Sequence, residues 1–81
     1  MHVLHACALL ARVLAIARHD ARQAWHAYHS DPAPDTLRDC QAAAAAWEHY
    51  RARLAALLLL LPPHEAAVYR RLYLEEDDRA A

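Results

Sequence analysis

A single break divides this chain, and there is no glycine anywhere in it. Residues 3–28 and 37–61 are two long runs with helical apolar spacing, and the corner between them, residues 30–35, holds Pro32 and Pro34. Tight turns and phosphate-binding loops generally use glycine, because glycine adopts positive φ without cost. With 21 alanines among 81 residues, the sequence therefore predicts an all-α fold whose helices are joined by proline-containing corners.

The first run predicts a helix over residues 2–29. Its apolar residues recur at alternating spacings of four and three, which is typical of a helix that packs lengthwise against another helix. Leu9, Val13 and Ile16 widen this apolar face, but only in the first half of the helix. The residues of the regular seam are Val3, Cys7, Leu10, Leu14, Ala17, Ala21, Ala24 and Tyr28.

The second run predicts a helix over residues 35–61. Ser30 or Asp31 is the expected N-cap, with Pro32 at the first helical position, where a missing N–H is harmless. Leucines on all sides of residues 57–61 are not tolerated on an exposed helix, so we expect another surface to cover them.

Pro62 and Pro63 end the second helix and predict a short third helix over residues 63–76. Acidic residues crowd positions 75–78, at the C-terminal end, where the helix dipole disfavours negative charge. We therefore expect a frayed tail over residues 77–81.

The two long helices should form an antiparallel hairpin, because the connection between them is short. The excess apolar surface then collects where the first helix begins and the second ends. Two copies should dimerise there into a helical bundle, because a single 81-residue chain has little core of its own. The expected core anchors are Trp25, Trp47, Tyr28, Tyr50, Leu54, Leu57 and Leu58. The expected interface is Leu9, Val13, Ile16, Leu57, Leu59 and Leu60.

The composition argues against several classes of protein. The longest apolar run, residues 54–61, is far shorter than the roughly 20 residues that span a bilayer. The formal net charge of −1 gives no strong attraction to nucleic acid or to a membrane. Arginines alternate with Asp20, Asp39 and Glu48, which leaves no continuous basic stripe. We expect a cytoplasmic protein, with its two cysteines reduced.

Seven histidines raise the question of a metal or haem site. His26 and His29 stand three apart on one helix, a spacing that can share a metal ion. A further ligand would have to come from His49 or from a second copy. Solvent-facing histidines are the plainer interpretation, and we expect no cofactor.

The sequence gives even less indication of an active site than of a metal site. No carboxylates pair along the sequence, and the single serine and single threonine both lie near the corner, where they are better explained as caps. Both cysteines fall on the apolar faces, which favours burial over reactivity. We expect a protein that is not an enzyme.

Residues 61–68, Leu-Pro-Pro-His-Glu-Ala-Ala-Val, are followed by Arg70, Tyr73, Leu74 and Glu75. This segment resembles the opening of region 4 in bacterial sigma factors, in which an LPP turn starts a helix with a similar apolar pattern. The likeness covers about 15 of 81 residues, and the sequence ends before the helix-turn-helix that follows in that family. The resemblance implies contact with the transcription machinery rather than recognition of promoter DNA.

Taken together, the sequence predicts a small, non-enzymatic helical module, such as an adaptor or inhibitor, that binds itself and a further protein. Two alternatives stay open. One is a transcription-linked regulator that contacts RNA polymerase or nucleic acid through residues 61–75. The other is a bundle that binds metal or haem through His26, His29 and His49.

Overall fold

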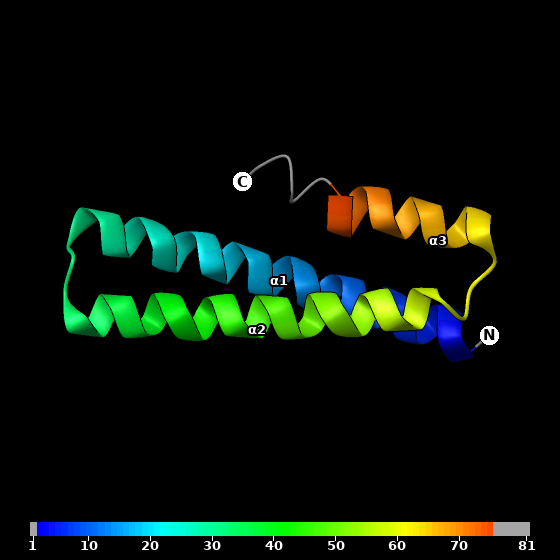
Figure 1. Cartoon of the computed structure of the whole chain (residues 1–81), viewed down its shortest axis with the longest axis horizontal. Helices are drawn as coiled ribbons and strands as arrows, with labels where there is room; N and C mark the ends of the chain where they lie inside the picture. Colours follow the sequence, from blue (N-terminus) through cyan, green and yellow to red (C-terminus); the bar gives the residue numbers. More distant parts are fainter. Residues whose placement is uncertain (1, 76–81) are drawn as a thin grey trace.

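The computed structural model describes residues 2–75 of the chain, and side chains within residues 3–74. Helix α1 spans His2–Ser30, α2 spans Pro34–Leu58 and α3 spans Pro63–Tyr69, after which a π-helical segment, η1, spans Arg70–Glu75. α1 and α2 lie antiparallel as a hairpin, and α3 with η1 turns back along it (Figure 1). The predicted all-α hairpin with a short third helix is confirmed, and residues 2–75 contain no strand.

The corner of the hairpin is tighter than predicted. α1 continues to Ser30 and α2 begins at Pro34, so that the corner is residues 31–33 rather than 30–35. The proline that starts the helix is Pro34, not Pro32, and the N-cap is Ala33, with an extended backbone at φ −147° and ψ 160°. The reason is that a residue before proline disfavours the helical region, so Ala33 stays extended and Pro34 takes the first turn.

Thr36 supplies the hydrogen bonds that an alanine N-cap cannot make. Its hydroxyl oxygen accepts from the Ala33 N–H at 2.9 Å. The same hydroxyl lies 2.8 Å from the Asp31 carbonyl and 3.0 Å from the Ala33 carbonyl, to which it can donate. One side chain thus satisfies backbone groups on both sides of the corner, which is the task we had assigned to Ser30 or Asp31.

The far end of α2 also differs from the prediction. α2 ends at Leu58 instead of residue 61, and the next three residues form a tighter turn. The N–H groups of Leu59, Leu60 and Leu61 donate to carbonyls three residues back, at 3.0 to 3.3 Å. Pro62 and Pro63 explain this change, because neither has an N–H with which to continue the α-helical hydrogen bonds.

The third helix changes its winding partway. α3 stops at Tyr69 and the chain continues as η1 to Glu75, where a single helix over residues 63–76 was expected. Residue 76 and the expected frayed tail, residues 77–81, lie outside the described residues.

The core lies at the end of the hairpin that holds the start of α1 and the end of α2, here called the wide end. Its centre combines all three helices: Cys7, Leu14, Leu54, Leu58 and Ala66 are buried together. Tyr69, Tyr73 and Leu74 of α3 and η1 pack against this cluster. Each fully buried leucine contributes about 1.5–3 kcal/mol. Three of the seven residues that are buried within residues 3–74 are alanines, so the core there is small.

The predicted core anchors are only partly confirmed. Leu54 and Leu58 are fully buried, whereas Trp47, Tyr28, Tyr50 and Leu57 are half-buried. Trp25 as a core anchor is wrong, because 52% of it is exposed. It lies near the corner end of α1, which neither α3 nor η1 reaches (Figure 1).

Candidate interaction surface

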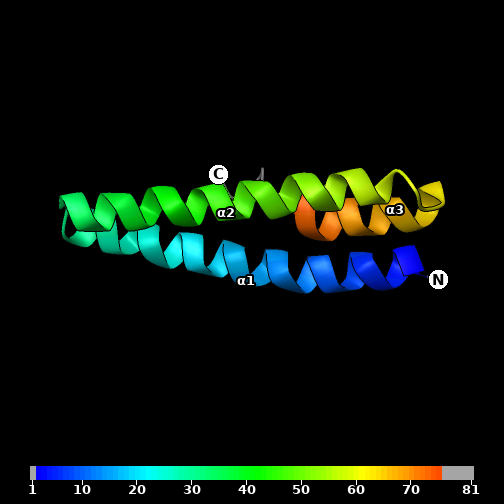
Figure 2. The same ribbon diagram turned by 90° about the horizontal axis from the view of Figure 1, so that it is seen from below.

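One side of the hairpin is covered and the other is bare. α3 and η1 lie along one side at the wide end, at the top in Figure 1, and Figure 2, which is turned by 90° and seen from below, shows them behind the hairpin. No described helix packs on this opposite side, here called the open face. The molecule is accordingly elongated: its radius of gyration is 14.2 Å, against about 12 Å for a compact chain of this length.

On α1, the open face carries a row of branched apolar side chains. Leu9, Val13 and Ile16 follow one another at spacings of four and three, which places them on one side of the helix. They are 47%, 37% and 63% exposed. Asp20 continues this row toward the corner and is also exposed. Leu9, Val13 and Ile16 are here called the branched row.

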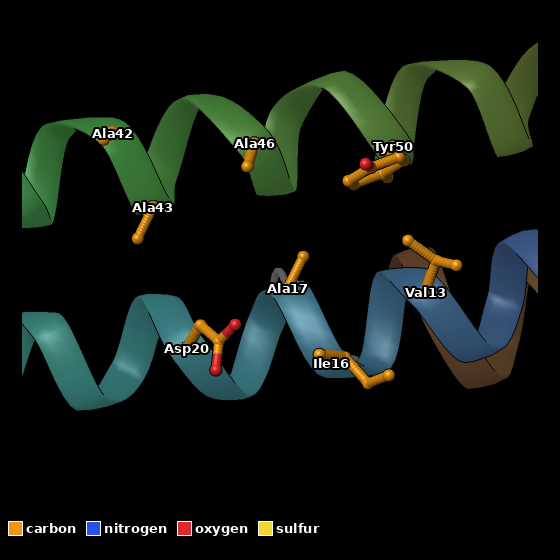
Figure 3. A pocket seen from close by; sticks show the side chains of 8 residues that line it. All are labelled: Val13, Ile16, Ala17, Asp20, Ala42, Ala43, Ala46 and Tyr50. Atoms are coloured by element: carbon orange, nitrogen blue, oxygen red, sulfur yellow. The ribbon is translucent and has the colours of Figure 1, made fainter.

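On α2, the open face carries small side chains. Ala42 and Ala46 are exposed, Ala43 is half-buried, and Tyr50 lies half-buried toward the wide end. Ala42, Ala43 and Ala46 are here called the alanine row. A shallow groove of about 450 Å³ runs between the two rows. In Figure 3, Val13 and Ala17 point toward α2 and Ala43 points toward α1 across this groove.

The structure places most of the predicted interface on this face or at its end. Leu9, Val13 and Ile16 form the branched row, and Val13 and Ile16 also line the groove. Leu57 is half-buried against the core, and Leu59 and Leu60 are 76% and 67% exposed in the turn after α2. α3 leaves both of these turn leucines uncovered, so the described helices do not supply the surface that is expected to cover them.

The sequence analysis did not single out Ala42 and Ala46 of the alanine row as part of a surface. Alanine is neutral in an apolar pattern, and only the spacing of Ala42, Ala46 and Tyr50 at every fourth residue indicates a continuous side of the helix. The groove itself holds little charge: Asp20 is the one ionisable acid or base among its lining residues, apart from the Tyr50 phenol. Such a surface is typical of the middle of a protein interface, which is depleted in charge.

The three predicted metal ligands are not gathered within one chain. Val13 lies across the groove from Tyr50, which places His49 opposite the middle of α1. His26 is about 12 residues farther along α1, or about 18 Å of helix rise. His29 instead makes an edge-to-face contact with Trp25, with ring centroids 4.1 Å apart. No group of three or more metal-ligating side chains occurs within residues 2–75.

The pKa values of two titratable side chains at the core, Cys7 and Tyr69, are raised, which favours their neutral forms. Burial raises the pKa of the Cys7 thiol. Burial also raises the pKa of the Tyr69 phenol, and the neighbouring Cys7 thiol adds to the effect. A thiol whose pKa is raised is a poor nucleophile, so Cys7 behaves as a small core residue, as expected from the sequence.

A smaller apolar patch lies on the outer surface of α3 and η1. Ala67, Val68, Arg71 and Leu72 surround a shallow hollow there. Both Val68 and Leu72 are exposed. These residues fall within the segment that resembles sigma factor region 4.

In the part of the chain that the structure describes, no helix has the length and apolar character needed to cross a membrane. No protein-family model matches this chain, and comparisons with curated proteins and with solved structures find no match either. The sigma-factor resemblance of residues 61–75 therefore stays a prediction from the sequence.

Proposed function

We propose that this protein is a non-enzymatic helical interaction module that works as a homo-oligomer, with the open face of the hairpin as its binding surface. In this proposal it acts in the cytoplasm, where Cys7 and Cys40 stay free thiols. Its role is that of an adaptor or inhibitor, in which the pair of hairpins presents the remaining helix surfaces to a further protein.

The observation that supports this function is the one-sided position of α3. Apolar side chains occur on both sides of the hairpin at the wide end, yet α3 and η1 lie along only one of these sides (Figures 1 and 2). Leu9, Val13 and Ile16 are left in water on the other side. Fully burying an exposed side chain of this size is worth about 1.5–3 kcal/mol, and covering the part of each that is still exposed would give a fraction of that amount.

The small core supports the same conclusion. Within residues 3–74 seven residues are buried, three of them alanine. This is a modest core, and small domains of this kind commonly gain stability by oligomerising.

The test is the solution mass of the wild-type protein and of two matched variants, measured by light scattering after size-exclusion chromatography. We expect the wild type to have twice the 9.2 kDa chain mass. Ile16→Asp, which puts a charge on the open face, should give a monomer with unchanged helical content. Val68→Asp, the same kind of change on the outer surface of α3, should remain a dimer. A monomeric wild type at high protein concentration would overturn the proposal.

A second candidate function rests on the exposed patch of α3 and η1. Val68 and Leu72 are exposed beside Arg71, within the segment whose resemblance implies contact with the transcription machinery. Binding of core RNA polymerase that is lost in Val68→Asp but retained in Ile16→Asp would support this function. Absence of any binding by the wild type would remove it.

A further inference from the structure

The third helix and η1 rest on one end of a hairpin that is continuous without them. α1 and α2 lie side by side along the length of the molecule, whereas α3 and η1 lie against the wide end alone (Figure 1). η1 contacts both long helices. α3 together with η1, residues 63–75, is here called the strap. Within residues 2–75, the strap has the hairpin as its one packing partner.

The helical structure of the strap is weak on its own. α3 has 7 residues and η1 has 6, and isolated helices shorter than roughly 12–15 residues are marginal in water. The π-helical winding of η1 is rare in proteins. The N-cap of α3 is Pro62, and no side chain caps this helix start. The strap therefore stays helical because it packs on the hairpin.

The contacts that hold the strap are few and lie on one side of it. Ala66 is buried in the core, and Tyr69, Tyr73 and Leu74 are half-buried against it. The rings of Tyr69 and Tyr73 stack on each other, with centroids 6.0 Å apart. The guanidinium of Arg51 on α2 donates a hydrogen bond to the Leu74 carbonyl at 3.3 Å. Since these contacts share one side, the strap can separate from the hairpin as a unit.

The thiol of Cys7 lies beneath the strap. Cys7 belongs to α1 and is 0% exposed, in the cluster that contains Ala66. The Tyr69 phenol is close enough to Cys7 for the two groups to interact. If the strap separates, Cys7 loses the cover of Ala66 and Tyr69 while α1 keeps its own backbone hydrogen bonds. Access to this thiol therefore reports whether the strap is closed.

We propose that the strap opens from an otherwise intact hairpin, and that this opening, rather than unfolding of the whole chain, exposes Cys7. Proteins open locally in units that often coincide with a supersecondary element, at free energies below that of global unfolding. The strap is such a unit, because residues 59–62 join it to α2 and its own helices melt once they leave the hairpin. This inference concerns the side of the hairpin opposite the open face, so it does not rest on the proposed function.

The experiment measures the rate at which Cys7 reacts with an aromatic disulfide that releases a coloured thiolate. Cys40→Ala is the background, because it leaves Cys7 as the one thiol of the chain. When closing is fast, the rate is proportional to the opening equilibrium constant. Two matched variants change an exposed helical alanine to glycine: Ala67→Gly in the strap and Ala44→Gly in α2. Each glycine should favour the non-helical state of its own segment by about two- to fivefold.

The two glycine variants separate opening of the strap from global unfolding. Ala67→Gly should accelerate the labelling of Cys7 by about two- to fivefold, because the strap loses its helices when it opens. Ala44→Gly should leave the rate unchanged, because α2 stays helical, although thermal unfolding should show that both variants are destabilised alike. Equal acceleration in both variants would mean that Cys7 is exposed by global unfolding and would overturn the proposal. An unchanged rate in Ala67→Gly would overturn it as well.

Discussion

The guanidinium of Arg51 donates a hydrogen bond to the backbone carbonyl of Leu74 at 3.3 Å. This contact joins the last turn of η1 to the middle of α2, and it gives a partner to one of the carbonyls that a helix end leaves without one. Arg51 is also 3.9 Å from Glu48, one turn earlier on α2, which helps to hold the side chain in place.

Replacing this arginine should loosen η1 without unfolding the hairpin. In Arg51→Met the aliphatic part of the side chain remains, but the hydrogen bond to Leu74 is lost, at a cost of about 1–2 kcal/mol. Hydrogen exchange of the backbone amides in residues 70–75 should accelerate by about tenfold, while exchange in α1 near Leu14 changes little. Arg38→Met, an exposed position near the corner, is the matched control. Equal acceleration in both variants would contradict the role assigned to Arg51.

The hydroxyl of Thr36 should contribute more to the stability of the fold than its methyl group does. Thr36→Val keeps the shape of the side chain but removes the oxygen that accepts from the Ala33 N–H, so we expect a loss of about 1 kcal/mol. In a domain of this size that lowers Tm by about 4–8 °C. Thr36→Ser, which retains the oxygen, should lose less than half as much. A valine variant as stable as wild type in thermal unfolding followed by circular dichroism would show that the corner does not depend on this bond.

Alkaline pH should lower the free energy of unfolding, because two side chains at the core then lose their protons. The pKa of Cys7 and the pKa of Tyr69 are both raised in the folded protein above their ordinary values of 9.0 and 10.0. A raised pKa means that the unfolded chain releases these protons first, so the stabilisation is complete below about pH 9 and is lost as the pH rises further. Urea unfolding at a series of pH values should show a decreasing free energy of unfolding above this point.

Two cysteine variants serve as controls, in which the decrease of the free energy of unfolding with pH is compared with that of the wild type. Cys7→Ala removes one of the two titrating groups and the effect of its charge on Tyr69, so its stability should decline less steeply with pH than that of the wild type. Cys40→Ala retains both groups and should follow the wild-type slope. If all three slopes coincide, burial of Cys7 is not the origin of the effect.

Any zinc binding should require two copies. His26 and His29 can offer two ligands, and His49 is too far along the hairpin to complete the site within one chain. Because we expect no cofactor, Zn²⁺ should leave the solution mass of the wild-type protein unchanged. Light scattering with Zn²⁺ and then with a chelator tests this. A reversible mass increase that disappears in the double variant His26→Ala/His29→Ala would favour the metal-binding alternative.

Local signals accounted for most of the helical pattern. The hairpin and the third helix follow from 4-3 spacing and from the two proline breaks, because helix periodicity and proline sterics depend only on near neighbours. Helix ends were predicted less well. Which of Pro32 and Pro34 starts α2 depends on how Thr36 bonds back to the corner, and the change to η1 after Tyr69 has no signal that we recognise in the sequence.

The residues of the candidate surface were also only partly predictable from the sequence. Leu9, Val13 and Ile16 stand out in the sequence as a surplus beyond one apolar seam, and they form the branched row. Ala42 and Ala46 do not stand out, because alanine fits a core, a groove or an exposed helix equally well. Trp25 was misjudged for the reverse reason: its size suggested a core residue, but burial depends on a neighbouring layer, and neither α3 nor η1 reaches it.

By itself, the sequence determined that the chain forms a hairpin with excess apolar surface at one end, since spacing along each helix decides which residues share a side. Only the tertiary structure decided which of the two sides of the hairpin α3 covers, and therefore which residues remain open. That choice depends on how Tyr69, Tyr73 and Leu74 pack against Leu14, Leu54 and Leu58. It is a free-energy difference between contacts that lie far apart in the sequence, and no local pattern encodes it.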